Sequence, residues 1–334
     1  MQILVLGGTR FVGRHIVESA LARGHDVTVF HRGSSGPELV PEAEHILGDR
    51  ATDLSRLAGR QWDATIDVCG YFPRQVTELA AALDGRGGQH LFVSSVSVYA
   101  PPPGPGITED AELIELVDPT VEVVTDQTYG GLKVLCERAA AAAYGSDLLV
   151  VRPTYVVGPH DHTWRFPTWV RRIAAGGEVL CPGPADTPQQ VIDARDQGDF
   201  VVHLLEGGGG ARGSAGGTFH TVSPRPPFSI GDLLSATADV VAPAGTTLRW
   251  VDGDRLVAEG LDSTAFPFWE PGFPDEADLN AVDPSAAYAA GLTTRPLADT
   301  IADTAAWVRE AAGSAPAGMG LDPAREADLI SRLG

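Results

Sequence analysis

Two side chains in the stretch TYGGLK, Tyr129 and Lys133, have types and spacing that suggest acid–base chemistry. They are four residues apart within a predicted helix over residues 127–145, so they share one face of that helix. A tyrosine is an effective base only when its pKa falls well below about 10, and a neighbouring ammonium favours its anion. The pair therefore predicts a site of proton transfer, with an ordinary pair of helix neighbours as the alternative.

A glycine-rich turn near the start of the chain predicts a binding site for a dinucleotide. An apolar strand over residues 2–8 runs directly into a predicted helix over residues 11–24. Gly7 ends the strand in a tight turn, Gly8 lets backbone N–H groups approach a pyrophosphate, and Gly13 lets the helix pack closely on the sheet. The strand-turn-helix context favours this interpretation over a purely structural turn. The residues expected to contact the dinucleotide here are Gly7, Thr9, Arg10, Phe11, Val12 and Gly13.

The end of the next predicted strand, residues 25–33, indicates which dinucleotide is bound. Sites selective for NAD place a carboxylate there for the ribose 2′-hydroxyl, whereas this chain has His31 and Arg32. Arg32 and Arg10 are expected to make charge-assisted contacts to a 2′-phosphate from two sides. We therefore expect NADP(H), with NAD as the second choice; the alternative is that both arginines are solvated surface residues. Asp49, in LGD after the third strand, is expected to accept a hydrogen bond from the adenine amino group.

The elements that position these residues alternate along the first half of the chain. Near-continuous apolar strands separated by helices imply a parallel sheet covered on both faces. The predicted fold class is therefore α/β, a doubly wound (Rossmann) sheet with a smaller C-terminal substrate-binding lobe. The dinucleotide-binding domain is assigned residues 1–158 with 186–222, and the lobe residues 159–185 with 223–334. Predicted strands cover residues 2–8, 25–33, 44–49, 62–70, 90–100 and 147–158, and predicted helices cover residues 11–24, 75–85 and 127–145.

The order of motifs resembles the extended short-chain dehydrogenase/reductase family, the group of sugar epimerases, dehydratases and reductases that includes the NAD-dependent epimerase/dehydratase type. The resemblance spans nearly the whole chain. It rests on the glycine turn, LGD, the serine-rich strand FVSSVSVYA, YxxxK, RPTYVVGP, VIDARD and RPLADTIADTAAWV. It implies an NAD(P)-dependent oxidoreductase that transfers a hydride at a carbonyl or alcohol carbon. The alternative enzyme is an epimerase or dehydratase of a sugar or nucleoside-like substrate, with transient reduction of the cofactor.

The same resemblance implies roles for individual residues. Ser95, four residues before Tyr99, is the expected catalytic serine, with Ser94 and Ser97 as its neighbours. It would hydrogen-bond the substrate oxygen and stabilise charge there. Lys133 is expected to hold the nicotinamide ribose as well. Further expected cofactor contacts are His31, Arg50, Cys69, Gly70, Tyr129 and Pro153, and expected substrate contacts are Ser97, Tyr155, Trp164 and Trp269.

Departures from the family pattern weaken an assignment to ordinary UDP- or TDP-sugars. Tyr155 stands where the family has the asparagine of RxFNxYGP, and Gln189 stands where an arginine often lies near the diphosphate. Aromatic clusters over residues 160–173 and 263–273 are expected to line or cover a pocket, with core packing of the lobe as the alternative. The connection over residues 101–124 is long enough to form a lid or rim beside the site.

Composition limits the function classes that the chain can serve. A net charge of −20 argues against a nucleic-acid or anionic-membrane surface. The turn GGTRFVG is nevertheless similar to that of the chloroplast stem-loop RNA-binding branch of the family, so a non-catalytic RNA-binding relative is a third alternative.

Cysteine usage and hydropathy favour a cytoplasmic protein. The three cysteines are odd in number and far apart, which fits reduced thiols, and no run reaches about 18 apolar residues. His160, Asp161 and His162 could suggest a metal site, but the sequence supplies no further ligands for it, so a polar loop is expected and no metal. The expected partner is a small-molecule substrate, and the alanine-rich helix that contains Tyr129 is compatible with a homodimer.

Overall fold

The computed structural model divides the chain into two compact units and describes all residues except 35–39, 101–104, 209–216, 272–280, 312–314 and 334. Unit 1 comprises Met1–Thr154, Ala194–Val222 and Val282–Thr293, and unit 2 comprises Tyr155–Asp193, Ser223–Ala281 and Thr294–Gly334. The division differs from the boundaries expected from the sequence, because residues 155–158 and 186–193 belong to unit 2 and residues 282–293 to unit 1.

Unit 1 is built on a seven-stranded sheet in the order β10-β6-β5-β4-β1-β2-β3, and all its strand pairs are parallel. The strand order reverses between β1 and β4, which confirms the predicted doubly wound sheet. In such sheets ligands bind beside the carboxyl ends of the strands at the point of reversal. The strands are β1 (Gln2–Leu6), β2 (Asp26–His31), β3 (Glu44–Leu47), β4 (Ala64–Asp67), β5 (Gln89–Val93), β6 (Leu148–Pro153) and β10 (Gly217–Thr221).

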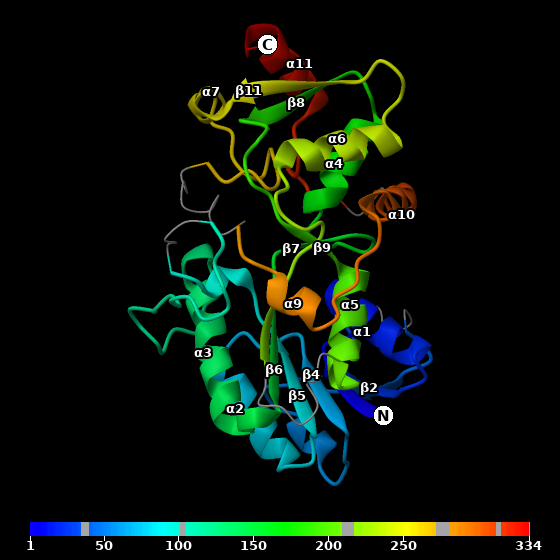
Figure 1. The fold of residues 1–334 in the computed structure, drawn as a ribbon, viewed down its shortest axis with the longest axis vertical. Helices are drawn as coiled ribbons and strands as arrows, with labels where there is room; N and C mark the ends of the chain where they lie inside the picture. The colour runs from blue at the N-terminus through cyan, green and yellow to red at the C-terminus, as the bar shows by residue number, and fades with distance from the viewer. Residues whose placement is uncertain (35–39, 101–104, 209–216, 272–280, 312–314, 334) are drawn as a thin grey trace. The chain divides into compact units, whose positions relative to one another are not determined.

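Two helix pairs cover the sheet of unit 1. Helix α1 (Phe11–Ala22) packs against α5 (Ala194–Leu205), and α2 (Pro73–Leu83) packs against α3 (Asp126–Tyr144), on the opposite face (Figure 1). Strand β1 shows how the sequence requires this arrangement, because successive strand residues face opposite sides of a sheet. Ile3 and Val5 belong to one buried cluster with Ile16 of α1. Leu4 and Leu6 belong to another with Leu79 of α2.

Short elements complete unit 1. They are the 3₁₀ turns η2 (Leu54–Leu57), η3 (Val96–Val98) and η4 (Gly145–Asp147), and the helix α9 (Ser285–Ala289), which packs against β10.

The strand predicted over residues 147–158 is wrong as a single element. The structure divides it into β6, which lies between β5 and β10, and β7 (Tyr155–Val157), which pairs with β9 (Val191–Asp193) in unit 2. Pro153 has no N–H group to continue the ladder, so the main sheet ends there.

Unit 2 holds two small parallel sheets and a group of helices. Strand β8 (Glu178–Gly183) pairs with β11 (Thr247–Asp252). Helices α4 (Arg165–Ala174), α6 (Ile230–Val241) and α10 (Leu297–Glu310) pack on one another, while α7 (Gly253–Ala258) and α11 (Pro323–Leu333) lie against the β8–β11 pair (Figure 1). Within the described part of the chain, no helix has the length and hydropathy needed to cross a membrane.

Candidate active site

The segment that joins β1 to the first turn of α1 has no space for side chains at its three glycines. A Cβ at Gly7, which has φ +106°, would lie 2.6 Å from Cγ2 of Val68. Gly8 has φ +71°, and a Cβ there would lie 2.7 Å from Cγ1 of Val29. A Cβ at Gly13 would lie 2.7 Å from the backbone nitrogen of Gly8, so the first turn of α1 packs directly on the loop. A close backbone turn leading into a helix N-terminus fits the pyrophosphate of a dinucleotide.

The other residues predicted at this turn occupy different environments. Thr9 and Phe11 are buried, Val12 is partly buried, and Arg10 is exposed at the N-cap of α1. Arg10 is therefore accessible at the helix N-terminus, and its contact with a cofactor stays a prediction.

Two histidines, His31 at the end of β2 and His45 in β3, fix the turn that contains Arg32. The Gly33 N–H donates to Nδ1 of His31 (3.0 Å), whose Nε2 lies 2.9 Å from Nδ1 of His45, and Nε2 of His45 lies 3.1 Å from the Val40 carbonyl. A carbonyl only accepts, so Nε2 of His45 carries a proton and Nε2 of His31 donates to His45. Burial, with a smaller effect of His45, lowers the pKa of His31 and keeps it neutral at pH 7. Arg32 itself is exposed.

Arg50 is committed to the interior of unit 1. Its two terminal nitrogens donate to the fully buried Asp67 at 2.9 and 2.8 Å, and one of them also lies 3.3 Å from Sγ of Cys69. Burial opposes the charge on Asp67, but the Arg50 guanidinium outweighs it and lowers the pKa of that carboxyl. Its Nε is buried and has no hydrogen-bond partner among the described residues, so a cofactor contact by Arg50 would come from Nε or from its backbone. Asp49, beside it, accepts from the Ala51 N–H (2.8 Å).

The three predicted catalytic residues all belong to unit 1. Ser95 lies two residues after the end of β5 and caps η3: its Oγ accepts from the Ser97 N–H (3.1 Å) and donates to the Ser97 hydroxyl (3.0 Å). Tyr129 is partly exposed in the first turn of α3, where its N–H donates to the Thr125 carbonyl (2.9 Å). Lys133 lies one turn further along and is 3% exposed.

Close packing of α3 on the serine turn brings Tyr129 beside that turn. A Cβ at Gly130 would lie only 2.0 Å from the Ser97 carbonyl oxygen, so the helix backbone touches the backbone of the turn. A Cβ at Gly131 would lie 2.4 Å from Cγ of Leu116. The two glycines between Tyr129 and Lys133 are thus sites of close approach, which the YxxxK pattern alone does not reveal.

The Lys133 ammonium sits at the carboxyl ends of two central strands. Its Nζ donates to the carbonyls of Gly70, after β4 (3.0 Å), and Val93, the last residue of β5 (2.9 Å). The rings of Tyr71 and Phe92 flank it, with centroids 5.0 and 4.8 Å from Nζ. Lys133 therefore joins the predicted cofactor residue Gly70 to the strand that leads to Ser95.

A buried polar network supports the serine turn and was not predicted from the sequence. Nε and one terminal nitrogen of Arg152 donate to Glu137 (3.0 and 2.6 Å), and another donates to the Tyr99 hydroxyl (2.5 Å). Nδ1 of His220 donates to the Asp283 carbonyl (2.9 Å), so its Nε2 is left to accept from the Tyr99 hydroxyl (2.5 Å). Burial raises the pKa of Tyr99 to about 12 and lowers that of His220, so both stay neutral at pH 7.

The same network anchors the connection between Ser97 and α3. Arg152 donates to the Glu109 carbonyl (2.9 Å), and the His220 N–H donates to the Glu109 carboxylate (3.0 Å). Ile107 forms a parallel bridge with Val282. Of the predicted lid or rim over residues 101–124, residues 101–104 lie outside the described part. The contacts of Ile107 and Glu109 anchor the stretch there, and its role beside the site stays a prediction.

The predicted substrate residues of unit 2 make packing contacts. Trp164, only 2% exposed, packs on Trp307 with ring centroids 5.4 Å apart. The Tyr155 ring lies 5.0 Å from that of Phe268, and Trp269 is partly buried. These contacts account for Trp164 as a core residue, so its role in substrate binding stays a prediction.

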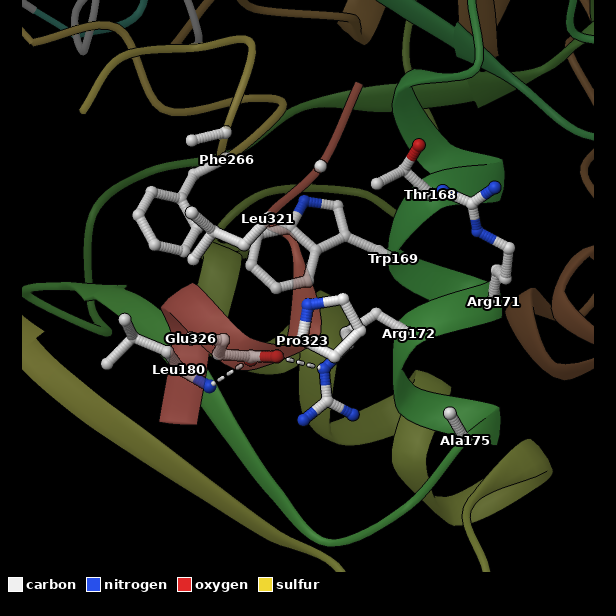
Figure 2. A pocket seen from close by; sticks show the side chains of 12 residues that line it. Thr168, Trp169, Arg171, Arg172, Ala175, Leu180, Phe266, Leu321, Pro323 and Glu326 are labelled. Atoms are coloured by element: carbon white, nitrogen blue, oxygen red, sulfur yellow. Dashed lines mark hydrogen bonds and ion pairs between the residues drawn. The ribbon is translucent and has the colours of Figure 1, made fainter. Parts of the chain in front are cut away.

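Unit 2 also contains a cavity of about 270 Å³ between α4, β8 and the segment leading into α11 (Figure 2). Trp169 and Phe266 form an aromatic wall, and the Arg172–Glu326 ion pair (2.5 Å) lies at its edge, where Glu326 also accepts from the Leu180 N–H (2.9 Å). The predicted substrate residues do not line it. The lining residues are Thr168, Trp169, Arg171, Arg172, Ala175, Leu180, Ala265, Phe266, Gly320, Leu321, Pro323 and Glu326.

Two further predicted cofactor residues sit at the ends of sheet strands: Cys69 follows β4, and Pro153 ends β6. Burial raises the pKa of the Cys69 thiol. Among the described residues, no group of three or more histidine, cysteine, aspartate or glutamate side chains is arranged to hold a metal ion.

Comparison with known families identifies the class to which this arrangement belongs. The sequence model of the NAD dependent epimerase/dehydratase family matches residues 3–70 and 63–214. The chain belongs to this family. Membership of the NAD dependent epimerase/dehydratase family indicates an enzyme that works with a nicotinamide cofactor, and it confirms the family resemblance inferred from the motifs.

Two curated relatives of this chain are described as proteins of different kinds, one a stem-loop binding protein and the other a reductase. The chain is 26% identical over 221 residues to the chloroplast stem-loop binding protein of 41 kDa b from Arabidopsis thaliana, a match that covers 61% of this chain and 55% of that protein. It is 24% identical over 247 residues to the dTDP-4-dehydro-6-deoxy-D-allose reductase of Streptomyces bikiniensis, covering 62% of this chain and 73% of the reductase. The chain thus spans about half the length of the chloroplast relative.

Solved structures show that the epimerase/dehydratase fold extends over nearly the whole chain. A UDP-glucose-4-epimerase from Stenotrophomonas maltophila, with bound NAD and formylated UDP-arabinopyranose, matches with a TM-score of 0.69 at 19% identity, covering 94% of this chain and 100% of that one. The UDP-glucuronic acid 4-epimerase of Bacillus cereus, in complex with NAD, matches with a TM-score of 0.65 at 17% identity, covering 93% and 99%. At these identities the likeness establishes the fold.

Proposed function

We propose that the chain is an NAD(P)-dependent oxidoreductase in which Ser95, Tyr129 and Lys133 act at a carbonyl or alcohol carbon of a small-molecule substrate. The observation that carries the proposal is the position of Lys133. Its buried ammonium is held by two carbonyls at the carboxyl ends of β4 and β5, one helical turn from Tyr129. A buried charge is costly, so its placement at the sheet edge where ligands bind supports a use in catalysis.

Each of the three side chains has a distinct part in the proposed reaction. When bound, the nicotinamide supplies or takes up a hydride at the substrate carbon. Tyr129 gives a proton to the oxygen on that carbon in reduction and takes it back in oxidation. The Lys133 charge favours the tyrosinate form, and the Ser95 hydroxyl donates a hydrogen bond to the same oxygen.

The preferred cofactor in this proposal is NADP(H). His31 is buried and neutral where NAD-selective sites carry a carboxylate, and the turn after it presents an exposed Arg32. Arg10 is exposed at the N-terminus of α1. Two exposed guanidiniums near the expected ribose favour a 2′-phosphate. NAD, which the two solved epimerases named above hold, is the alternative cofactor.

The alternative reaction is epimerisation or dehydration with transient reduction of the cofactor. It is favoured by the likeness to sugar-nucleotide epimerases, whereas the Streptomyces relative is described as a reductase. Tyr155 and Gln189 depart from the family pattern for nucleotide sugars, so we propose a substrate other than an ordinary UDP- or TDP-sugar. Gln189 is buried, with its backbone N–H bonded to the Phe228 carbonyl (3.0 Å).

RNA binding is the second candidate function, because one curated relative is described as a stem-loop binding protein. The net charge of −20 disfavours it, since RNA affinity comes largely from neutralising phosphates.

The deciding experiment is to identify any nucleotide that the purified protein retains. One portion of the protein is denatured, and the nucleotide released into the supernatant is identified by mass spectrometry. A second portion, kept folded and freed of nucleotide, is titrated with NADPH and with NADH. A tightly retained nucleotide supports the epimerase or dehydratase reaction, and exchangeable NADPH supports a reductase. If neither nucleotide binds at millimolar concentration while a stem-loop RNA does, the enzymatic proposal fails.

A further inference from the structure

Tyr71 is an aromatic residue that the family motifs do not include, and it lies against the catalytic lysine. It follows β4 and Gly70, and its N–H donates to Oε1 of Gln75 in α2 (2.9 Å). Tyr71 is 41% exposed as a residue, and its ring centroid is 5.0 Å from Nζ of Lys133. A cation at this distance from an aromatic face is attracted by it.

The two rings that flank the Lys133 ammonium differ in exposure. Phe92, 4.8 Å away, is fully buried in the strand β5, so it covers the ammonium from the protein interior. Tyr71 is the partly exposed ring, so it stands between the ammonium and solvent. Two of the three ammonium N–H groups are used by the Gly70 and Val93 carbonyls, which leaves one donor for a ligand.

We propose that Tyr71 is a positioning residue for Lys133: its ring holds the ammonium in place and keeps water from it, so that the lysine charge acts on Tyr129. This inference rests on the proposed function, because the roles of Lys133 and Tyr129 come from it. The aromatic face, and not the hydroxyl, performs the task. Excluding water lowers the local dielectric and strengthens the attraction between the ammonium and a tyrosinate.

The other titratable groups near Lys133 do not compete for this role. Burial raises the pKa of the Tyr71 hydroxyl, and the charge of Tyr129 raises it further, although Lys133 opposes the shift. Tyr71 therefore stays protonated at the pH at which Tyr129 must ionise. Burial also raises the pKa of Cys69, after β4, and raises that of Cys136, on α3, to about 12, so both thiols are neutral at pH 7.

The proposal is tested by comparing Tyr71→Leu, which removes the ring, with Tyr71→Phe, which keeps the ring and removes the hydroxyl. Tyrosine ionisation is followed by absorbance near 295 nm in the full-length protein, with and without Tyr129→Phe in each background. The difference isolates the ionisation of Tyr129 without needing turnover. With Tyr71→Leu the midpoint should rise by about 0.4 to 1.5 pH units, while Tyr71→Phe should keep the wild-type midpoint.

Kinetics provide the second readout. Tyr71→Leu should lower kcat about 2- to 30-fold and move the acid limb of the pH profile upward in parallel, with KM nearly constant. An unmoved midpoint in Tyr71→Leu, or an equal change in Tyr71→Phe, would overturn the inference. A wild-type protein without NAD(P)-dependent turnover would refute the proposed function instead, while the absorbance titration still tests the contact between Tyr71 and Lys133.

Discussion

Replacing Gly130 by alanine tests the contact that places Tyr129 beside the serine turn. The added Cβ would lie 2.0 Å from the Ser97 carbonyl oxygen, whereas an ordinary C···O contact is about 3.3 Å or longer. The helix or the turn must therefore move by roughly 1 Å. Alanine improves helix propensity by about 1 kcal/mol, and overpacking costs about 1–3 kcal/mol, so the free energy of unfolding should fall by only about 0–2 kcal/mol.

The effect on catalysis should be much larger than the effect on stability. A displacement of about 1 Å at a reacting group costs about 100-fold, so kcat of Gly130→Ala should fall by that factor, while NADPH affinity should change little. Gly131→Ala is the matched control, because its Cβ would meet the flexible side chain of Leu116 (2.4 Å) rather than backbone. That variant should lose less stability than Gly130→Ala, because a side chain can move where a backbone carbonyl cannot, and it should lose no more than a few-fold in kcat.

Urea denaturation and steady-state kinetics on both variants measure these effects. If Gly130→Ala retained kcat within a few-fold of wild type, the contact between α3 and the serine turn would not be what positions Tyr129.

Three further predictions concern the acid–base pair, the cofactor and pH. Tyr129→Phe should bind NADPH normally but lose about 10²–10⁴ in turnover, whereas Lys133→Met should weaken both; a fully active Tyr129→Phe would contradict the proposed chemistry. Arg32→Asp should reduce the preference for NADPH over NADH by about 10- to 150-fold in fluorescence titrations, and an equal loss for both would mean that Arg32 does not contact the 2′-phosphate. Burial lowers the pKa of His90 from 6.5 to about 4, so the unfolded chain takes up a proton that the folded protein does not as pH falls through this window. The free energy of unfolding should therefore drop by about 3 kcal/mol between pH 6.5 and 4, and His90→Phe should remove much of that slope in urea titrations; an unchanged slope would show that His90 is not responsible.

The sheet could be predicted from the sequence because its signals are local. Strand β1 is apolar on both faces and ends at a glycine turn, and the helix after it repeats apolar residues at the spacing of one face. The division of residues 147–158 into β6 and β7 could not be predicted, because both halves are apolar and rich in valine. What separates them is the choice of partner strand, which is a property of the tertiary fold.

The candidate site could be predicted where two of its residues belong to one sequence motif. Tyr129 and Lys133 lie on one helix, so their spacing alone puts them together. Arg50 illustrates the limit: the family resemblance implied a cofactor contact, but Asp67, 17 residues later, accepts from both of its terminal nitrogens. The Tyr99–His220 hydrogen bond joins two residues that are 121 positions apart in the sequence, and no local sequence pattern indicates such a pair.

The separation between Tyr99 and His220 also affects the order in which unit 1 is completed during synthesis. At about 5–20 residues per second, the 121 residues between them take roughly 6–24 s to translate, far longer than a helix or hairpin needs to form. Tyr99, Glu137 and Arg152 therefore emerge from the ribosome well before His220, whose imidazole accepts a hydrogen bond from the Tyr99 hydroxyl. During that interval β6 has no β10 beside it, so β6 is an open edge strand of the nascent sheet. We expect a chaperone that recognises unpaired strands to bind the nascent chain at this edge.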